Sequence, residues 1–492
     1  MIPSIFDEED HFRLHIGRGA SDNPLMKTRA SLHHLLVLIL IVILGGCSDQ
    51  EKAQLLERAT NETISQLGKE SEHSLSRPVM SDWPHMFGPT GNSRSPETWV
   101  DVNWPATGPQ MVWEQQVGLG YSCPVIAGGR LVMLHRIDDW ELATTYDSET
   151  GQLLWETAWP ASYQNQYEYS RGTYTTPIID GDRVYVLGAT CDLLCLSLED
   201  GTRIWERDLD ADYRPGELPY GFGATPLLED DRLIINLGGQ VGDSGIVAID
   251  KMSGETLWTS TQEAASYCTP VATTVDERRL VLVLSKQNLN CLDPDTGDVF
   301  WQEEFGIKNS RERINAVSPM LVGADRVVVT FGPGPGARMY QLYGDGSHSE
   351  LWSTRRGGLE SQYTNLLVNE DSIYGFSYRT SCELRCIDLE TGEQRWVWDF
   401  DHQLRRSMSI QIGDRYVIAL GQEGHLLSLA PNSDGPRLIS SMEEPVLSPN
   451  CFTQPVLSRG LLYLRNEEQL KCFSLRPKSM ESQMLTTKEL AP

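Results

Sequence analysis

Two acidic runs in this sequence have the spacing of calcium-binding loops. The run from Asp293 to Asp298 alternates carboxylates around a glycine, and Asp208, Asp210 and Asp212 alternate in the same way. Such loops offer Ca²⁺ the carboxylate oxygens that it prefers. The first run, however, coincides with a turn that recurs along the chain, and the second is typical of a solvated acidic insertion. We therefore expect neither run to hold a metal.

The other residue types that carry chemistry show no catalytic arrangement. The ten histidines show no metal-ligand spacing. The glycine-rich run from Phe331 to Gly336 contains prolines, which lack the N–H donors that a phosphate-binding loop needs. We predict no catalytic residue and no metal ligand.

One cysteine has a distinctive context, because Cys47 ends a segment typical of an export signal. If translation starts at Met26, a short basic segment precedes an apolar run from Leu35 to Leu44. Gly45 and Gly46 come directly before the cysteine. The apolar run is about half of the roughly 20 residues that a membrane-spanning helix needs. This ending resembles a bacterial lipobox, in which the cysteine thiol is diacylglycerylated; the alternatives are a plain signal peptide and a short anchor. The expected layout is an over-extended gene start over 1–25, a lipoprotein signal peptide over 26–46 and a flexible tether over 47–80.

Charge and cysteine count limit the environment of the chain. A net charge of −27 would repel nucleic acids and anionic lipid surfaces, so we expect no nucleic-acid partner and membrane contact through a lipid anchor alone. If Cys47 is lipidated, the other nine of the ten cysteines lie outside the cytoplasm, where disulfides persist, and an odd count leaves at least one thiol unpaired. Their pairing is left open. Four of them recur at one strand position and are expected to be small core residues: Cys195, Cys291, Cys386 and Cys472.

A repeat of about 45 residues organises the chain from about residue 111 onward. Each copy contains four short segments rich in β-branched and aromatic residues, separated by turn residues, which predicts four strands. The first strand carries a recurring marker position. It is occupied in the eight copies by Pro124, Pro177, Pro226, Pro270, Pro319, Leu366, Ser409 and Pro455.

The end of each copy carries the most regular pattern, in which a small residue, Asp, Gly and Trp follow at fixed offsets. Ala248, Asp250, Gly254 and Trp258 show it completely. We expect the Asp to cap the turn and the Trp to pack between adjacent sheets, with its indole N–H on a backbone acceptor. The tryptophans expected in this structural role are Trp113, Trp155, Trp205, Trp258, Trp301, Trp352 and Trp396.

With this pattern, the chain resembles the pyrroloquinoline-quinone-like (PQQ-like) repeat family. The resemblance implies an all-β fold, an eight-bladed β-propeller of four-stranded antiparallel blades over residues 111–476. The last copy lacks a Trp-bearing fourth strand, and the segment around Trp113 is a fourth strand without partners. We therefore expect the N-terminal strand to complete the last blade, which removes free sheet edges. Residues 81–110 are expected to pack on the propeller as a lead-in segment, and residues 477–492 to form a disordered tail.

Aromatic and arginine residues precede several first strands, where propellers gather loops at one end of the central channel. These residue types are enriched at binding hot spots. The alternative is that the aromatic rings only plug the channel. The candidate partner-binding face consists of Tyr121, Arg171, Tyr174, Phe222, Tyr267 and Arg406.

The resemblance implies two classes of function. Some family members are PQQ-dependent dehydrogenases that hold calcium with Glu, Asn and Asp and often carry two adjacent cysteines; no such cysteine pair exists here. The chain is more similar to the BamB-type lipoproteins of outer-membrane protein assembly. We therefore expect a non-catalytic, monomeric scaffold that binds proteins, without cofactor, on the periplasmic face of a membrane, with the outer membrane favoured over the inner one. The alternatives are a PQQ- and calcium-dependent or cryptic dehydrogenase, and a carbohydrate- or polymer-binding surface module.

Overall fold

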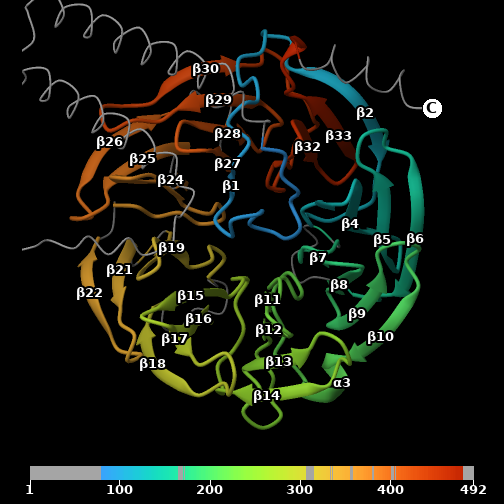
Figure 1. Ribbon diagram of the computed structural model, residues 1–492, viewed down its shortest axis with the longest axis vertical. Helices are drawn as coiled ribbons and strands as arrows, with labels where there is room; N and C mark the ends of the chain where they lie inside the picture. Colours follow the sequence, from blue (N-terminus) through green and yellow to red (C-terminus); the bar gives the residue numbers. More distant parts are fainter. Residues whose placement is uncertain are drawn as a thin grey trace, which may run out of the picture. The chain divides into compact units, whose positions relative to one another are not determined.

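The strands of the repeat form a ring of eight β-sheets in the computed structural model (Figure 1). The structure describes residues 79–163, 170, 172–305, 315–332, 334, 336–354, 358–378, 382–399, 404 and 406–479. Cys47, Arg171, the expected signal peptide and most of the expected tether and tail lie outside this part. Within it, no helix has the length and apolar character needed to span a membrane.

Each sheet contains one blade of four antiparallel strands, which lie in order from the channel outward, and the sheet of blade 7 has a fifth strand (Figure 1). Blade 1 contains β3 (Val125–Ala127), β4 (Arg130–Ile137), β5 (Trp140–Asp147) and β6 (Leu153–Pro160). Blade 2 contains β7 (Ile178–Asp180), β8 (Arg183–Leu187), β9 (Asp192–Ser197) and β10 (Arg203–Asp208). Blade 3 contains β11 (Leu227–Glu229), β12 (Arg232–Asn236), β13 (Ile246–Asp250) and β14 (Thr256–Ser260). Blade 4 contains β15 (Val271–Val275), β16 (Arg278–Leu284), β17 (Asn288–Leu292) and β18 (Val299–Glu304).

The second half of the ring repeats the arrangement. Blade 5 contains β19 (Met320–Val322), β20 (Arg326–Phe331), β21 (Gly336–Leu342) and β22 (His348–Ser353). Blade 6 contains β23 (Leu367–Val368), β24 (Ser372–Tyr378), β25 (Cys382–Asp388) and β26 (Gln394–Asp399). Blade 7 contains β27 (Met408–Ile412), β28 (Tyr416–Leu420), β29 (Leu426–Ala430) and β30 (Arg437–Ser441). Blade 8 contains β31 (Val456–Ser458), β32 (Leu461–Arg465), β33 (Gln469–Ser474) and β2 (Gln110–Gln116).

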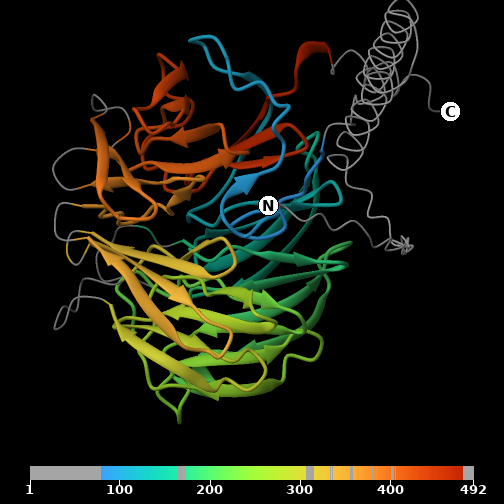
Figure 2. The same ribbon diagram turned by 60° about the vertical axis from the view of Figure 1, so that its left-hand side comes forward.

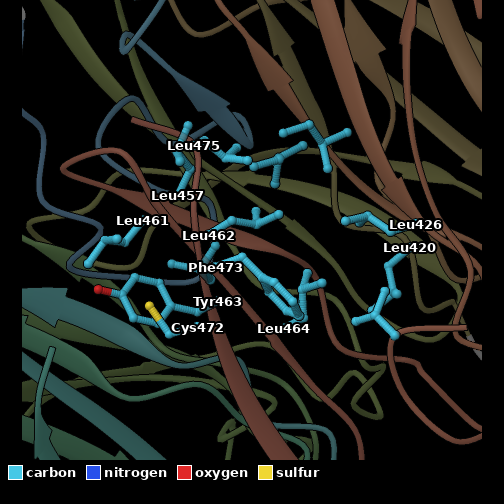
Figure 3. Close-up of a cluster of buried hydrophobic side chains, with 14 of the residues drawn as sticks. Leu420, Leu426, Leu457, Leu461, Leu462, Tyr463, Leu464, Cys472, Phe473 and Leu475 are labelled. Atoms are coloured by element: carbon cyan, nitrogen blue, oxygen red, sulfur yellow. The ribbon is translucent and has the colours of Figure 1, made fainter. Parts of the chain in front are cut away.

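The last blade closes the ring as the sequence predicts. Strand β2 pairs antiparallel with β33, with Trp113 opposite Cys472, which confirms closure by the N-terminal strand. A large core cluster joins this blade to blade 7, and Figure 3 shows the side chains of Leu420 and Leu426 beside those of β32 and β33. Apolar burial of this kind contributes about 25 cal/mol per Å².

The expected docking tryptophans connect neighbouring blades. Six indole N–H groups donate to a backbone carbonyl in the closing turn of the next blade: Trp113 to Ser148 (3.0 Å), Trp155 to Leu198 (3.0 Å), Trp205 to Lys251 (3.1 Å), Trp258 to Pro294 (2.9 Å), Trp352 to Leu389 (2.9 Å) and Trp396 to Asn432 (2.9 Å). In five of these six turns a glycine leaves room for the ring: Gly151, Gly201, Gly254, Gly297 and Gly392. At Gly254, with φ +77°, a Cβ atom would lie 2.9 Å from the Trp205 ring, so both the backbone and the packing favour glycine.

Trp301 departs from this arrangement. Its Nε1 is buried without a hydrogen-bond partner among the described residues. His348 lies four residues before Trp352, at the place of the turn glycine in other blades, and its ring stacks on Trp301 with centroids 3.9 Å apart. Its Nε2 also lies 3.0 Å from Glu303 Oε1. A histidine at the glycine position thus replaces the usual indole hydrogen bond with ring stacking.

The recurring cysteines lie directly opposite these tryptophans. Cys195 pairs with Trp205, Cys291 with Trp301, Cys386 with Trp396 and Cys472 with Trp113. All four are fully buried, and the eight cysteines whose side chains the structure describes are free thiols. A small side chain at this position makes room for the indole across the strand pair.

The two acidic runs have local structural roles. Asp208 caps the short helix α3 (Leu209–Tyr213) by accepting a hydrogen bond of 2.8 Å from the Ala211 N–H. Asp293 accepts one of 2.8 Å from the Asp295 N–H in its turn. Asp388 does the same in blade 6, where its contacts with Arg395 and the turn N–H groups lower its pKa to about 2.

The lead-in segment lies across the inner strands. Trp83 exchanges two backbone hydrogen bonds of 2.8 Å with Ile126 in blade 1, and the Ile179 N–H of blade 2 donates to Pro84 at 2.8 Å. Phe87 belongs to the core cluster shared by blades 4 and 5, and β1 (Arg94–Ser95) pairs parallel with β27 as a fifth strand of blade 7. Figure 2 shows this blue segment beside the orange and red strands of blades 7 and 8.

A buried arginine fastens blade 8 to blade 1. Arg465 is 0% exposed. Its guanidinium donates to four carbonyls of the blade 1 chain: Ser122 (3.0 Å), Leu134 (2.8 Å), Gly118 (3.2 Å) and Gly120 (2.8 Å). Burial lowers the pKa of this guanidinium to about 10, so it stays charged at neutral pH. The joint that closes the ring therefore depends on a charged group satisfied by backbone oxygens.

Candidate functional site: the central cavity

A cavity of about 520 Å³ lies in the channel, and all eight blades line it. Each contributes the residue three positions before its first-strand marker, which we name the cavity position. From blade 1 to blade 8, the cavity positions are Tyr121, Tyr174, Gly223, Tyr267, Ala316, Tyr363, Arg406 and Phe452. One position of the repeat therefore contributes a residue from every blade to the cavity wall, because equivalent residues of a propeller point to equivalent places around the axis.

The aromatic rings of this wall contact one another. Tyr121 lies with its ring centroid 6.0 Å from that of Tyr174 and meets Phe452 edge to face at 5.3 Å. Tyr267 accepts a hydrogen bond of 3.0 Å from the Tyr220 N–H through its hydroxyl oxygen. Burial raises the pKa of Tyr267 and Tyr363, so these phenols are neutral at neutral pH. The wall is an aromatic surface with neutral polar tips.

Blades 6 and 7 add the polar part of the cavity. The Arg406 guanidinium carbon lies 5.0 Å from the centroid of the Tyr363 ring, in cation–π geometry. Side-chain amides of Gln362, Asn365 and Gln454 also line the cavity. Ser409, another lining residue, has a buried hydroxyl without a hydrogen-bond partner among the described residues. The cavity thus combines an aromatic side with an amide- and guanidinium-bearing side.

The lead-in segment bounds the cavity through Met86. The Met86 carbonyl accepts a hydrogen bond of 3.2 Å from Gln454 Nε2, and its sulfur lies 3.5 Å from Thr269 Oγ1. The residues on either side of Met86 in the lead-in segment make backbone hydrogen bonds to blades 1, 2 and 7. The segment therefore lies across the channel beside these blades. Met86 is therefore a part of the cavity wall that does not come from a blade.

Glu467 fixes the wall at the joint between blades 8 and 1. Its carboxylate accepts hydrogen bonds from the Tyr121 hydroxyl (3.1 Å), the Gly120 N–H (3.1 Å) and the Ser170 hydroxyl. Glu467 follows β32 in sequence, and nothing in the repeat distinguishes it from other hairpin carboxylates. The ring position of Tyr121 is set by this contact.

The structure brings together four of the six residues of the predicted partner-binding face. Tyr121, Tyr174, Tyr267 and Arg406 line the cavity, whereas Arg171 lies outside the described residues. Phe222 does not line the cavity: it is 4% exposed and packs in the core with Leu209 and Tyr213. It lies one residue before the cavity position of blade 3, and neighbouring residues in an extended segment point to opposite sides.

Sequence reasoning missed Tyr363 and Phe452 as lining residues. The signal for Tyr363 and Phe452 was present, because both lie three residues before the marker position. Blade 3 has Gly223 at this place, where a Cβ atom would lie 2.8 Å from Tyr267 Cδ1 and 3.2 Å from Tyr174 Cβ. The glycine lets these two tyrosines approach its backbone.

The described cavity wall does not fit a calcium-bound quinone. Ca²⁺ takes about six to eight oxygen ligands, usually with carboxylates among them, and the residues that line the cavity include no Asp or Glu. In the described part of the chain, no group of three or more His, Cys, Asp or Glu residues is placed to hold a metal. Glu141 has a pKa raised to about 7 by burial, but its oxygens accept hydrogen bonds from the Ala189 N–H (3.0 Å) and Trp159 Nε1 (3.1 Å) and it does not line the cavity.

Comparison with known proteins gives matches of two kinds. A family model described as outer membrane protein assembly factor BamB matches residues 102–218 and 141–398. A protein of that name from Alkalilimnicola ehrlichii is 25% identical over 190 residues, 38% of this chain and 44% of the relative. The match therefore spans less than half of that relative's length.

Solved structures similar to this chain include proteins of different names. A quinohemoprotein alcohol dehydrogenase from Pseudomonas putida HK5 has a TM-score of 0.57 at 11% identity, over 80% of each chain. BamB from Moraxella catarrhalis has a TM-score of 0.49 at 17% identity, over 75% of this chain and 98% of that one. At these identities the dehydrogenase match shows the fold alone.

Proposed function

The chain belongs to the family of outer membrane protein assembly factor BamB, and from this premise we propose that it is a non-catalytic propeller of the cell envelope that binds other proteins during outer-membrane protein assembly. Family membership supports the part of the proposal that places the chain in outer-membrane protein assembly. The residues of the cavity wall support the part that says it binds other proteins.

The observation that carries this proposal is the set of cavity positions. Five are aromatic and one is arginine, and these residue types dominate protein-binding hot spots. They lie on eight blades, and indole hydrogen bonds connect six of the eight pairs of neighbouring sheets, so the wall is held in one arrangement before a partner arrives. Such preorganisation reduces the entropy lost on binding.

A dehydrogenase would need different residues at this place. It must hold the reactive carbon of its cofactor against a base, and the described wall offers phenols, amides and one guanidinium without a carboxylate. We therefore propose that no quinone and no calcium are bound there. No contact in the described wall favours a carbohydrate over a polypeptide.

We further propose that Cys47 carries the lipid that holds the chain on a membrane. Replacing Cys47 with alanine is expected to move the protein from the membrane fraction to the soluble fraction, because a thiol is required for acylation. Fractionation with intact mass measurement checks this. A fully membrane-bound Cys47→Ala variant, with a wild-type mass that shows no lipid, would contradict the anchor.

Photo-crosslinking from the cavity mouth tests the binding function. A photo-reactive phenylalanine analogue in place of Tyr363 is expected to capture a polypeptide in the native envelope, because Tyr363 lines the cavity and is 39% exposed. Micromolar binding of the quinone with Ca²⁺, accompanied by dye reduction, would overturn the non-catalytic assignment.

A further inference from the structure

We propose that the central cavity holds one aromatic side chain of a partner polypeptide in a recess at blade 5, between the rings of Tyr267 and Tyr363. This inference rests on the proposed function and names the feature of the partner that the same site recognises.

The ring of cavity positions is open at blade 5. Ala316 occupies the position there, whereas the two neighbouring blades have Tyr267 and Tyr363, and all three residues line the cavity. An alanine side chain ends at its Cβ atom, so it does not fill the space that a tyrosine ring takes at the equivalent place in the neighbouring blades. Ala316 is also only half-buried. The place of Ala316 is therefore a recess about one side chain wide.

The two flanking tyrosines contact the blades on their far sides. Tyr267 lies against Gly223 of blade 3, where a Cβ atom would be 2.8 Å from Tyr267 Cδ1. The Tyr363 ring lies 5.0 Å from the Arg406 guanidinium carbon of blade 7. Neither contact involves blade 5, so the two rings lie on either side of Ala316 without closing over it.

Blade 3 shows the opposite case. It has the other small cavity position, Gly223, and a Cβ atom there would lie 2.8 Å from Tyr267 Cδ1 and 3.2 Å from Tyr174 Cβ. The neighbouring tyrosines therefore already fill the space above this glycine. A small residue leaves an open recess at blade 5 and not at blade 3.

The interior of the recess is apolar. Phe331 at the end of β20 in blade 5 lines the cavity and is 6% exposed. Met86 of the lead-in segment lines the cavity as well and packs against the core cluster that contains Phe331. Methionine sulfur makes favourable contacts with aromatic rings, and aromatic rings pack well against one another in offset or edge-to-face geometry. These surroundings favour an aromatic side chain over an aliphatic or a charged one.

Uncharged polar groups lie beside the recess in blade 6. Gln362 directly precedes Tyr363 and Asn365 follows it by two positions, and both line the cavity. Neither side-chain amide has a hydrogen-bond partner among the described residues. Each amide offers donors and an acceptor, which match the C=O and N–H groups of a peptide backbone. The backbone that carries the aromatic side chain can therefore be bound by these two amides.

The size of the cavity agrees with a short segment. Its volume of about 520 Å³ lies in the range of about 300–1,000 Å³ typical of sites for small ligands. An aromatic side chain and a few flanking residues fit, and a folded domain does not. A partner therefore has to present the aromatic residue on a loop or at a chain end.

Calorimetry on the purified chain tests this inference with two matched peptides. The probes are acetyl-Gly-Ser-Phe-Ser-Gly-amide and the same peptide with Ala in place of Phe. The Phe peptide is expected to bind at least about tenfold more tightly, the difference that burial of a phenylalanine side chain predicts. Because both peptides are uncharged, added salt should leave this difference unchanged.

Filling the recess is expected to remove the preference. Ala316→Phe places a ring of the protein itself in the recess, so the Phe peptide should then bind no more tightly than the Ala peptide. The matched control is Ala158→Phe, because Ala158 is exposed on the outer strand β6 and the same change there should leave the preference intact. Coincident unfolding curves for both variants and the wild type show that folding is unaffected.

Removing one wall of the recess gives a second test that does not depend on the folding of Ala316→Phe. Tyr363→Ser is expected to lower the preference by about threefold or more, because the bound ring loses one of its two aromatic neighbours. The control is Tyr343→Ser, which should leave the preference unchanged, since Tyr343 is 43% exposed and does not line the cavity.

Three results would overturn the inference: equal binding of the two peptides to the wild type, an unchanged preference in both Ala316→Phe and Tyr363→Ser, or binding of a neutral glucose trimer while neither peptide binds. If the peptides bind equally or not at all but position 363 still crosslinks to a polypeptide, the aromatic anchor is wrong and the binding function stands. If position 363 captures no polypeptide, the proposed function itself fails.

Discussion

Replacing Arg465 with methionine is expected to lower the free energy of unfolding by about 3–5 kcal/mol. The four carbonyls of blade 1 that accept its hydrogen bonds are at a buried joint, and each buried acceptor without a partner costs about 1–3 kcal/mol. Relief of the desolvation of the buried charge returns part of this loss. Urea unfolding of the folded chain, followed by tryptophan fluorescence, measures the difference.

The matched control is Arg437→Met, which removes an exposed arginine from β30 and should change stability by less than about 0.5 kcal/mol. Equal stability of Arg465→Met and the wild type would show that the closing joint does not depend on this guanidinium. An equal loss in both variants would point to a general effect of removing positive charge.

Replacing Trp258 with alanine is expected to cost about 3–5 kcal/mol, the range for emptying a buried aromatic site. The ring packs over Gly297 in the next blade, and its N–H bonds the Pro294 carbonyl at 2.9 Å. Thermal unfolding should show a clear decrease in Tm. Leu257→Ala provides the control, because Leu257 is adjacent in sequence and 46% exposed.

A comparison within the ring sharpens this prediction. Trp301→Ala should cost less than Trp258→Ala, since the Trp301 indole N–H has no described hydrogen-bond partner to lose. Identical Tm values for Trp258→Ala, Leu257→Ala and the wild type would show that the docking tryptophans do not stabilise the propeller.

The sequence predicts the blades and their closure because both follow from local, repeated features. Turn residues and alternating apolar segments recur at fixed offsets, and the unmatched strand at Trp113 has an unmatched partner at the other end of the repeat. Strand β1 could not be found in this way. It contains two residues, and its pairing with β27 joins Ser95 to Ile412, a contact that no periodicity encodes.

The candidate site was predictable in part. Residue type alone identified Tyr121, Tyr174, Tyr267 and Arg406. Phe222 shows that the residue type is not sufficient without the register of the segment, because a shift of one residue moves a side chain from the cavity to the core. The burial of Arg465 could not be predicted from the sequence, because a charged residue at the end of a strand is ordinarily exposed. Its burial depends on carbonyls contributed more than 300 positions earlier in the chain.

Photo-crosslinking from the cavity mouth is the most direct test of whether this propeller is a protein-binding scaffold. The photo-reactive residue is placed at Tyr363 and, as a matched control, at Ile204, which is 46% exposed on the outer strand β10. We predict a discrete crosslinked polypeptide from position 363 that is absent from position 204. Polypeptide products of equal yield from both positions, or none from position 363, would contradict the assignment of the central cavity as the binding site.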